Sequence, residues 1–343
     1  MYNSKDCIER CLDSLINQTL SKEKFEVIIV DDHSTDSSLD LVEQYKKNSS
    51  LNLQIITHRK NRGPGGARNT ALECAVGTYL AFIDADDTYT AQALQYYLEL
   101  IIESQAELLT FPFISSKDGK LFHENNPRDA LFEKEKTIDN NQLHRHPSFI
   151  FSQHAWNKIY HRDLIKKLHP FPEKQRYNED AWFSFEAFTV ANRISFSDKA
   201  YYIYHKDLET SSTRNTLTAK ESYQSHFNHI EKLFHYSSMH PEVAKPIFWY
   251  ALRNWQPFIG HILEGSSPLS EQESISLFTK TKEIFKRIPK EFKAPDGGLL
   301  HYLTARTMRV NHNLPDARAY YKKRKKILAC YYPVKKIILF WRT

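Results

Sequence analysis

Two groups of acidic residues could do chemistry, because each directly follows a short apolar stretch. Asp31 and Asp32 come after the apolar run 27–30, and Asp84-Ala85-Asp86-Asp87 comes after the run 79–83. Alternation along an extended chain would place Asp84 and Asp86 on one side, where two carboxylates repel unless a cation separates them. Mg²⁺ or Mn²⁺ shared with a diphosphate would relieve the repulsion. A solvated acidic turn that caps the next helix is the structural alternative.

A glycine-rich segment lies between the two acidic groups. It reads Asn61-Arg62-Gly63-Pro64-Gly65-Gly66-Ala67-Arg68-Asn69 and holds three of the nine glycines of the chain. Glycines permit close backbone approach, and the N-terminus of a following helix favours an anion, with Arg62 and Arg68 able to add positive charge. The segment lacks the GxxxxGK[ST] pattern of a P-loop. A plain tight connection is the alternative.

A third acidic pair, Glu179-Asp180, follows Asn178 and opens the apolar run 182–190. Acids in the first turn of a helix are commonly caps favoured by the helix dipole. The presence of two other acidic groups in the chain makes a catalytic pair the second interpretation.

The elements that must position these groups alternate between strand and helix. Strands are expected over 25–30, 53–57 and 78–83, and helices over 3–20, 37–47, 65–74 and 91–104. This alternation predicts an α/β fold, a doubly wound and mostly parallel sheet with helices on both faces. Ligands gather at the carboxyl ends of the strands of such a sheet, where both acidic groups stand.

Two changes of pattern divide the rest of the chain. Residues 115–145 are polar and irregular, with Asp118-Gly119 as an expected hairpin turn, and we interpret them as an insertion. Beyond 211, helical periodicity dominates over 217–235, 242–263, 270–288 and 299–310. The sequence therefore predicts two domains, a catalytic domain over 1–215 and a helical module over 216–343 with a basic, aromatic tail.

Composition places the chain among globular proteins. Its 343 residues are 41% hydrophobic and 26% charged, a length typical of two domains. No apolar run suits a membrane span, and the first residues lack the pattern of a secretory signal. The four cysteines form no CxxC pair, so we expect a cytoplasmic protein.

The net charge of +6 is concentrated at the C-terminal end. Nine basic residues and no acidic ones follow Asp316, interleaved with aromatic and aliphatic residues. This pattern suits an anionic membrane surface or a polyphosphate chain, and a solvated basic end is the alternative. No nucleic-acid-binding motif accompanies the charge, so we expect no nucleic-acid partner.

Together the motifs resemble those of the family 2 glycosyltransferases, nucleotide-sugar-dependent enzymes of the glycosyltransferase A fold. The resemblance covers roughly residues 1–213 and is carried, in the family's order, by Tyr2-Asn3, the segment 30–36, the glycine segment, 82–87, 155–160 and 178–180. More narrowly, the Gly-Pro-Gly loop, the stretch 198–202 and the residues 299–302 resemble the enzymes that attach N-acetylglucosamine to the polyol-phosphate chains of wall teichoic acid.

The resemblance implies a role for each polar group at the site. Asp31 and Asp32 would hold uracil and ribose, Arg68 would lie beside the nucleotide, and Asp84 and Asp86 would hold a Mn²⁺ or Mg²⁺ ion that bridges the diphosphate. The remaining donor-binding residues implied are Lys158, His205 and Lys206.

Asp180 matches the catalytic base of the family, and Glu179 would orient the donor sugar or the acceptor. The implied reaction is metal-dependent, inverting transfer of a sugar, expected to be N-acetylglucosamine, from a UDP-sugar to a hydroxyl of a surface polymer such as wall teichoic acid or another glycan. We expect the protein to act in the cytoplasm, at the inner face of the cell membrane. The alternative is a noncatalytic, truncated remnant that binds sugar or polyanion.

Two departures from the family pattern stand out. His205 and Lys206 occur where relatives often carry arginine near the phosphates. In addition, the family's first strand, an apolar stretch that ends in Pro-x-Tyr-Asn, would precede Tyr2. That strand is interior in such sheets, so we expect the first strand to be missing from the fold and the natural start to lie upstream.

Overall fold

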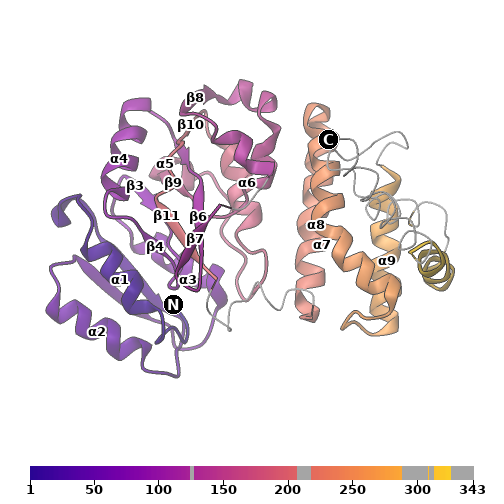
Figure 1. Cartoon of the computed structure of the whole chain (residues 1–343), viewed down its shortest axis with the longest axis horizontal. Coiled ribbons are helices and arrows are strands. Elements are labelled where there is room, and N and C mark those ends of the chain that lie inside the picture. The colour runs from indigo at the N-terminus through magenta and orange to yellow at the C-terminus, as the bar shows by residue number, and fades with distance from the viewer. Residues whose placement is uncertain (124–126, 207–217, 288–307, 309–312, 326–343) are drawn as a thin grey trace, which may run out of the picture. The chain divides into compact units, whose positions relative to one another are not determined.

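The computed structural model describes residues 1–123, 127–206, 218–287, 308 and 313–325. The chain forms two compact units, Met1–Ser212 and Thr213–Thr343 (Figure 1), compared with a boundary expected near 215. Within the described residues, no helix combines the length and the apolar character needed to cross a membrane.

The first unit alternates strands with helices. Its strands are β1 (Val27–Asp31), β2 (Leu53–Thr57), β3 (Tyr79–Ala81), β4 (Thr88–Tyr89), β5 (Leu108–Thr110), β6 (Phe113–Lys117), β7 (Lys120–Phe122), β8 (Lys136–Asp139), β9 (Lys158–His161), β10 (Arg193–Phe196) and β11 (Tyr202–His205). Its α-helices are α1 (Ile8–Ile16), α2 (Ser38–Asn48), α3 (Gly63–Cys74), α4 (Ala93–Ser104), α5 (Arg162–Ile165) and α6 (Ala181–Val190). Short 3₁₀ turns span Lys22–Lys24, Pro127–Leu131, Asn140–Arg145 and Pro147–Phe151.

These strands form three sheets. β1 and β2 are parallel, a second sheet has the order β3-β9-β5-β10-β8, and a third has the order β4-β11-β6-β7. The α/β class expected from the sequence is confirmed, but the sheets are mixed rather than mostly parallel. In the second sheet β9 is antiparallel to both β3 and β5, and β8 is antiparallel to β10. In the third sheet β4 is antiparallel to β11, and β7 is antiparallel to β6.

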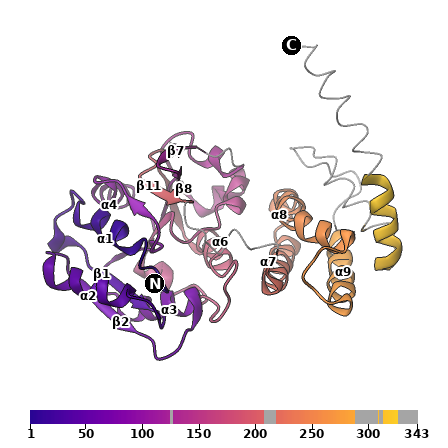
Figure 2. The same ribbon diagram turned by 60° about the horizontal axis from the view of Figure 1, so that its bottom comes forward.

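Local sequence accounts for the elements nearest the site. Ile8, Cys11, Leu12 and Leu15 recur at helical spacing on α1 and are buried. The apolar strand β1 lies between helices, with α3 packed on β1 and α2 packed on β2 (Figure 2). A Pro in the first turn of α3 suits the start of a helix, because its missing N–H is not needed there.

The polar segment 115–145 is more ordered than an irregular insertion. Its start forms the hairpin of β6 and β7, which turns at Asp118 and Gly119 with φ of 51° and 73°. Positive φ at both turn residues is the geometry that suits a two-residue hairpin and favours Asp-Gly. Its end forms β8, an edge strand of the second sheet.

The second unit is helical, as expected. α7 (Lys220–Met239), α8 (Ala244–Glu264) and α9 (Glu271–Lys286) pack together, with a 3₁₀ turn over Pro241–Val243. The fully buried Trp255 donates its indole N–H to Thr281 Oγ1 at 3.1 Å, and Ser270 with Glu273 forms a capping box at the start of α9. The helix expected over 299–310 lies outside the described residues, apart from the buried Met308.

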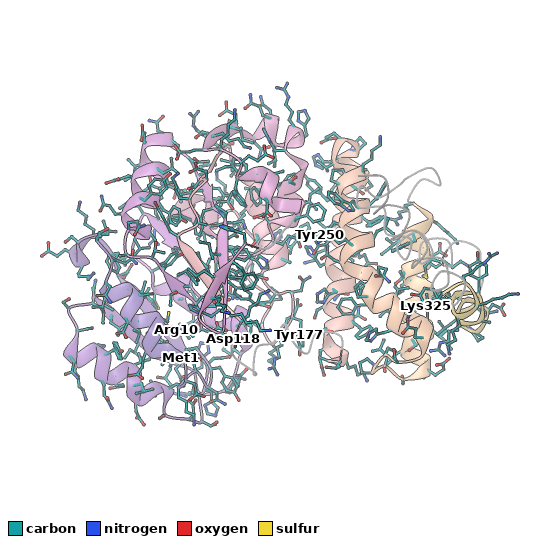
Figure 3. All side chains as sticks on the ribbon, in the orientation of Figure 1. Met1, Arg10, Asp118, Tyr177, Tyr250 and Lys325 are labelled. Carbon is teal, nitrogen blue, oxygen red and sulfur yellow. The ribbon has the colours of Figure 1, made fainter. Side chains whose placement is uncertain are left out.

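The first part of the basic C-terminal stretch is a packed helix over 314–325. Ala317 and Tyr321 are buried in it, and Arg318 donates to Ile262 O at 3.0 Å and pairs with Glu271 at 2.8 Å. Lys325, labelled in Figure 3, pairs with Glu264. Two of the basic residues therefore have partners within the unit, and residues 326–343 lie outside the described part of the chain.

Candidate functional site

Three carboxylates gather just beyond β3. Single oxygen atoms of Asp84, Asp86 and Asp87 all lie within 4.8 Å of one another. The chain here is not extended: a turn, closed by Asp87 N donating to Asp84 O at 3.0 Å, brings the side chains together. The expected convergence of Asp84 and Asp86 is therefore present, but a turn rather than strand alternation produces it.

The third carboxylate, Asp87, is held by the fold. It is fully buried and accepts hydrogen bonds from Tyr202 Oη at 2.6 Å and from His205 N at 2.9 Å. Both donors come from β11, a strand 115 or more residues along the chain. Sequence reasoning missed Tyr202, because nothing local marks a buried tyrosine as the partner of a distant acid.

The other two carboxylates keep oxygens available to a ligand and crowd each other. Burial and the neighbouring Asp84 raise the pKa of Asp86 to about 6. Arg10, labelled in Figure 3, donates from Nη2 to the backbone O of Asp86 at 2.8 Å, and its charge opposes the rise in the pKa of Asp86 only in part. Like charges in a confined site favour either a proton or a cation between them.

Arg68 connects this cluster to the acidic pair at α6. Its Nη2 lies 2.9 Å from Asp84 Oδ1, and its Nη1 lies 2.6 Å from Glu179 Oε1. The Arg68 side chain is largely buried, and these charge-assisted bonds fix Glu179 beside the cluster. The sequence placed Arg68 at the site but gave no sign of this double contact.

Asp180 stands next to Glu179 at the N-terminal cap of α6. Asn178 precedes the pair in the left-handed region, with φ of 59°, which turns the chain into the helix. Asp180 Oδ2 accepts a hydrogen bond from Ala155 N at 3.1 Å and does not cap the helix with its side chain. Burial and the adjacent Glu179 raise the pKa of Asp180 to about 7, so near neutral pH it can accept a proton.

The two acids that follow β1 differ in what they contact. Asp32 is buried and accepts from His58 Nδ1 at 2.7 Å, from Arg62 N at 2.8 Å and from Gly63 N at 2.8 Å. Asp31 accepts from Ser34 N at 3.2 Å through Oδ2, and its buried Oδ1 has no hydrogen-bond partner among the described residues. Asp31 therefore has an acceptor atom left for a ligand.

In the glycine segment, the glycines allow close packing of the chain rather than contact with a ligand. A Cβ on Gly65 would lie 2.3 Å from Pro172 O, and Gly63 has φ of 78°. The amides at the start of α3 are used by Asp32, so the anion at this helix terminus is a side chain of the protein itself. The close approach expected from the glycines is thus made by the chain near Pro172.

The last three donor-binding residues predicted from the sequence are differently placed. Lys158 lies in the core, and its ammonium donates to Ser152 O at 2.9 Å, His154 O at 2.7 Å and Asn157 Oδ1 at 2.8 Å. It organises the loop whose Ala155 N–H reaches Asp180. His205 contacts Thr88 Oγ1 at 3.0 Å beside the cluster. The Lys206 ammonium lies over the rings of Phe122 and Tyr204.

The assembled site is strongly acidic. The side chains that meet are Asp84, Asp86, Asp87, Glu179 and Asp180, with Arg68 as the cation between them. Such a site can hold a divalent cation through two carboxylates and can remove a proton through Asp180.

Comparison with known proteins gives a family match for the first part of the chain. Residues 1–168 match Glycosyl transferase family 2. A poly(ribitol-phosphate) beta-glucosyltransferase of Bacillus spizizenii is 35% identical over 211 residues, which are 60% of this chain and 31% of that protein. The poly(ribitol-phosphate) beta-N-acetylglucosaminyltransferase TarS of Staphylococcus aureus is 35% identical over 209 residues, 59% of this chain and 34% of TarS. The chain thus spans about a third of the length of these curated relatives.

One solved structure extends the similarity to both units. The crystal structure of residues 1–349 of S. aureus TarS in complex with UDP-GlcNAc superposes with a TM-score of 0.70 at 26% identity. It covers 95% of this chain and 90% of that one. The resemblance seen in the sequence is confirmed, and the glycosyltransferase A fold with a helical C-terminal region is shared with TarS.

Proposed function

Since residues 1–168 belong to Glycosyl transferase family 2, we propose that this chain transfers a sugar from a UDP-sugar to a hydroxyl of a polyol-phosphate polymer. The arrangement around Arg68 carries the proposal, because one guanidinium holds a carboxylate of the Asp84 cluster and the carboxylate next to Asp180. This arrangement supports the proposal that a cation-binding group and a proton acceptor act in one site. The preferred donor is UDP-N-acetylglucosamine, supported by the likeness to the TarS fragment crystallised with that molecule.

The residues present fit a divalent cation. Asp84 and Asp86 offer oxygen ligands within 4.8 Å of each other, and burial together with the neighbouring Asp84 raises the pKa of Asp86, an effect that a bound cation would oppose. Mg²⁺ and Mn²⁺ prefer such oxygen ligands and complete their shells with phosphate oxygens and water. When bound, the ion would offset the negative charge that develops on a departing diphosphate. Asp87 would hold the turn in place rather than act as a ligand, because Tyr202 and His205 already occupy its oxygens.

Asp180 is the proposed general base. The acceptor hydroxyl oxygen forms a bond to the anomeric carbon while the bond from this carbon to the diphosphate oxygen breaks. The hydroxyl proton moves to the Asp180 carboxylate, UDP leaves, and the configuration of the anomeric carbon inverts. A pKa of about 7 suits this role, because a base works best when its pKa lies near the working pH.

Glu179 and Asp31 complete the proposed donor site. Glu179, held by Arg68, would orient the sugar or the acceptor, and the unpartnered Oδ1 of Asp31 would accept a hydrogen bond from the uracil. Asp32 would act indirectly, by ordering the start of α3 from which Arg68 projects.

The acceptor proposal rests on relatives and on charge. Both curated relatives quoted above are poly(ribitol-phosphate) glycosyltransferases, and the C-terminal stretch of this chain is basic. A basic, aromatic-rich end would attract an anionic polymer, or an anionic membrane at the inner cell surface where such a polymer is assembled.

Titration of the whole chain with UDP and UDP-GlcNAc, each with and without Mn²⁺, tests the proposal. We expect saturable UDP binding that strengthens with Mn²⁺, and release of UDP when a short poly(ribitol-phosphate) acceptor is added. GDP is the matched control and should bind more weakly. A folded chain that binds no UDP in the presence of Mn²⁺ or Mg²⁺ would instead support a noncatalytic role.

A further inference from the structure

The loop over residues 152–157 joins the 3₁₀ turn Pro147–Phe151 to β9, and every residue of this loop except His154 is buried. Loops usually run over the surface of a protein, because a buried loop carries backbone groups that water cannot reach. Such groups are costly to leave without hydrogen-bond partners. Partners inside the protein must therefore satisfy the polar groups of this loop.

Lys158, the first residue of β9, supplies several of these partners. Its side chain is fully buried. Its ammonium donates to Ser152 O at 2.9 Å, to His154 O at 2.7 Å and to Asn157 Oδ1 at 2.8 Å. A lysine ammonium has three N–H donors, and these three acceptors belong to the first, third and last residues of the loop. One buried charge thus ties both ends and the middle of the loop together.

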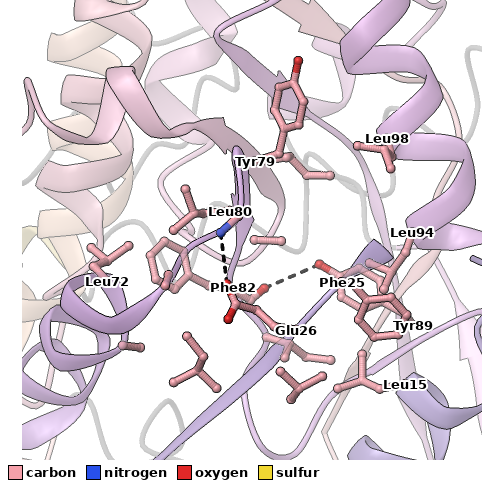
Figure 4. Close-up of a pocket in the computed structure, with 18 of the residues that line it drawn as sticks. Leu15, Phe25, Glu26, Leu72, Tyr79, Leu80, Phe82, Tyr89, Leu94 and Leu98 are labelled. Carbon is pink, nitrogen blue, oxygen red and sulfur yellow. Dashed lines mark hydrogen bonds between the residues drawn. The ribbon is translucent and has the colours of Figure 1, made fainter. Parts of the chain in front are cut away.

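The direction of the Lys158 side chain follows from its place on β9. Ile159, the next residue, lines an apolar cavity of about 640 Å³ that β1 and β3 flank (Figure 4). Successive side chains of a strand point to opposite faces, so Lys158 points away from this cavity. Its ammonium lies 5.2 Å from the centre of the Phe188 ring on α6, a cation–π contact. Lys158 therefore faces the helix whose N-terminal cap is Asp180.

The loop reaches the proposed base through Ala155. The Ala155 N–H donates to Asp180 Oδ2 at 3.1 Å, and Tyr160 Oη donates to Ala155 O at 3.2 Å. Burial and Glu179 raise the pKa of Asp180, whereas the bond from Ala155 opposes this rise by favouring the carboxylate. The position of one loop amide therefore affects both the orientation and the charge of Asp180.

The same loop reaches the turn over residues 84–87 through Trp156. The Trp156 ring stacks on the Tyr202 ring, with 4.5 Å between the ring centroids and 15° between the ring planes. Tyr202 Oη donates to Asp87 Oδ2 at 2.6 Å and accepts from Asp84 N at 3.4 Å. The packing of the two rings thus fixes the tyrosine that holds the turn.

We propose that Lys158 is a positioning residue for both halves of the acidic site and acts through the loop over residues 152–157. This inference rests on the proposed function, which makes Asp180 the base and assigns a cation to Asp84 and Asp86. The Lys158 ammonium keeps a buried loop in one conformation, and the loop holds the base on one side and the turn on the other. This role differs from the direct donor contact that the sequence led us to expect.

Lys158→Met tests this role, because it keeps the approximate length of the side chain and removes its three donors. Arg162→Met is the matched control. Arg162 follows the other end of β9, and its guanidinium donates to Gly77 O at 2.8 Å and to Ala75 O at 2.7 Å. Both variants take a cation away from backbone carbonyls and should lower the thermal unfolding midpoint. Only Lys158→Met should disturb the site.

The first measurement needs no nucleotide. Amide hydrogen exchange at Ala155, followed by NMR, should be about tenfold or more faster in Lys158→Met and unchanged in Arg162→Met. Lys158→Gln keeps two N–H donors and should give a smaller change in the same direction, so it replaces Lys158→Met if that variant does not fold. Unchanged exchange at Ala155 in the folded variant would overturn the proposal.

The second measurement uses UDP-GlcNAc, a poly(ribitol-phosphate) acceptor and Mn²⁺. We expect kcat to fall about tenfold or more in Lys158→Met, the scale for mispositioned reacting groups. UDP affinity without Mn²⁺ should stay the same, and the gain in UDP affinity on adding Mn²⁺ should become smaller. Arg162→Met should match the wild type in all three quantities.

Three outcomes of this measurement would count against the proposal. Faster exchange at Ala155 with an unchanged kcat would overturn the positioning role. A lower kcat with an unchanged gain from Mn²⁺ would overturn the link through Trp156 and Tyr202. A loss of UDP affinity in the absence of Mn²⁺ would make Lys158 a donor contact instead.

The exchange measurement separates this inference from the proposed function. A wild-type chain that neither binds UDP nor releases it from UDP-GlcNAc would refute the proposed function and, with it, the positioning role. The exchange data would then still show whether Lys158 holds Ala155 in place.

Discussion

The guanidinium of Arg68 lies between Asp84 and Glu179, 2.9 Å from Asp84 Oδ1 and 2.6 Å from Glu179 Oε1. Glu179 is 111 residues further along the chain and is adjacent to Asp180. One side chain thus holds the two halves of the acidic site at a fixed separation, and removing it would leave two carboxylates of like charge close together.

Replacing Arg68 with Lys should therefore impair both binding and turnover. A lysine keeps the positive charge but cannot make two directed bonds to two carboxylates. We expect kcat/KM for UDP-GlcNAc to fall about tenfold or more, the scale expected when reacting groups are mispositioned. Lys166→Met, which removes an exposed ion pair with Asp163, is the control and should leave kinetics unchanged. Normal kinetics in Arg68→Lys would contradict the positioning role.

The ionisation of Asp180 should set the lower pH limit of the transfer activity. Its pKa is raised to about 7, so below this pH the carboxyl is increasingly protonated and cannot accept a proton, while above it the base is available. The rate should rise as pH increases through about 7. Asp180→Asn should lower kcat about 10²-fold or more and spare UDP binding, and its residual rate should lose this inflection. An unchanged rate in this variant would rule out the base assignment; the exposed Asp163→Asn serves as control.

Asp86 and Asp87, the last two aspartates of the turn, should differ in what their replacement impairs. Asp86→Asn should weaken Mn²⁺-dependent UDP binding, because the Asp86 carboxylate is the proposed ligand. The free energy of unfolding should change little, because the variant also removes the repulsion between Asp84 and Asp86. Asp87→Asn should instead lower the free energy of unfolding, since Tyr202 and His205 N both donate to that carboxylate. Urea unfolding and UDP titration of both variants check the contrast. If both variants lost the Mn²⁺ dependence of UDP binding to the same extent, Asp87 would be a metal ligand as well.

Asp31 and Asp32, which follow β1, should likewise differ in whether their replacement impairs stability or UDP binding. Asp32→Asn leaves a buried backbone donor without an acceptor, and we expect a loss of about 1 to 3 kcal/mol in the free energy of unfolding. Asp31→Asn should reduce UDP affinity more than stability, because the Asp31 Oδ1 atom has no partner within the described residues. Chemical denaturation and UDP binding distinguish the two. A stability loss confined to Asp31→Asn would reverse these assignments.

Removal of residues 326–343 tests the basic tail without cutting the helix over 314–325. We expect UDP binding to be kept and binding to poly(ribitol-phosphate), or to vesicles with anionic lipid, to fall in a salt-sensitive way. A truncation at 318 would be a poor test, because Tyr321 is buried and Arg318 bonds to α8 and α9. Binding is measured by sedimentation of the intact and truncated chains with polymer or vesicles, at low and at moderate salt. If neither association weakens, the tail is a solvated end.

The sequence was informative where structure depends on near neighbours along the chain. Helical spacing of apolar residues located α1, α2 and α4, and the Asp118-Gly119 pair located a hairpin. The acidic stretches could be predicted as site residues because ligands gather at the carboxyl ends of the strands in an α/β fold. The short central strands β5, β9 and β10 gave too few residues for their periodicity to be recognised.

The amino-acid sequence by itself determined the order of the elements, the acidic and glycine-rich segments that follow them and the family that their motifs resemble. Only the tertiary structure decided that Arg68 bridges Asp84 to Glu179, that Asp87 and Asp32 are held within the fold, and that Lys158 supports a loop. It also decided that β1 and β3 flank an apolar cavity instead of belonging to one sheet. The physical reason is that periodicity depends on bonds between near neighbours, whereas the contacts of Arg68, Asp32 and Asp87 join residues 16 to 118 positions apart, and packing alone brings them together.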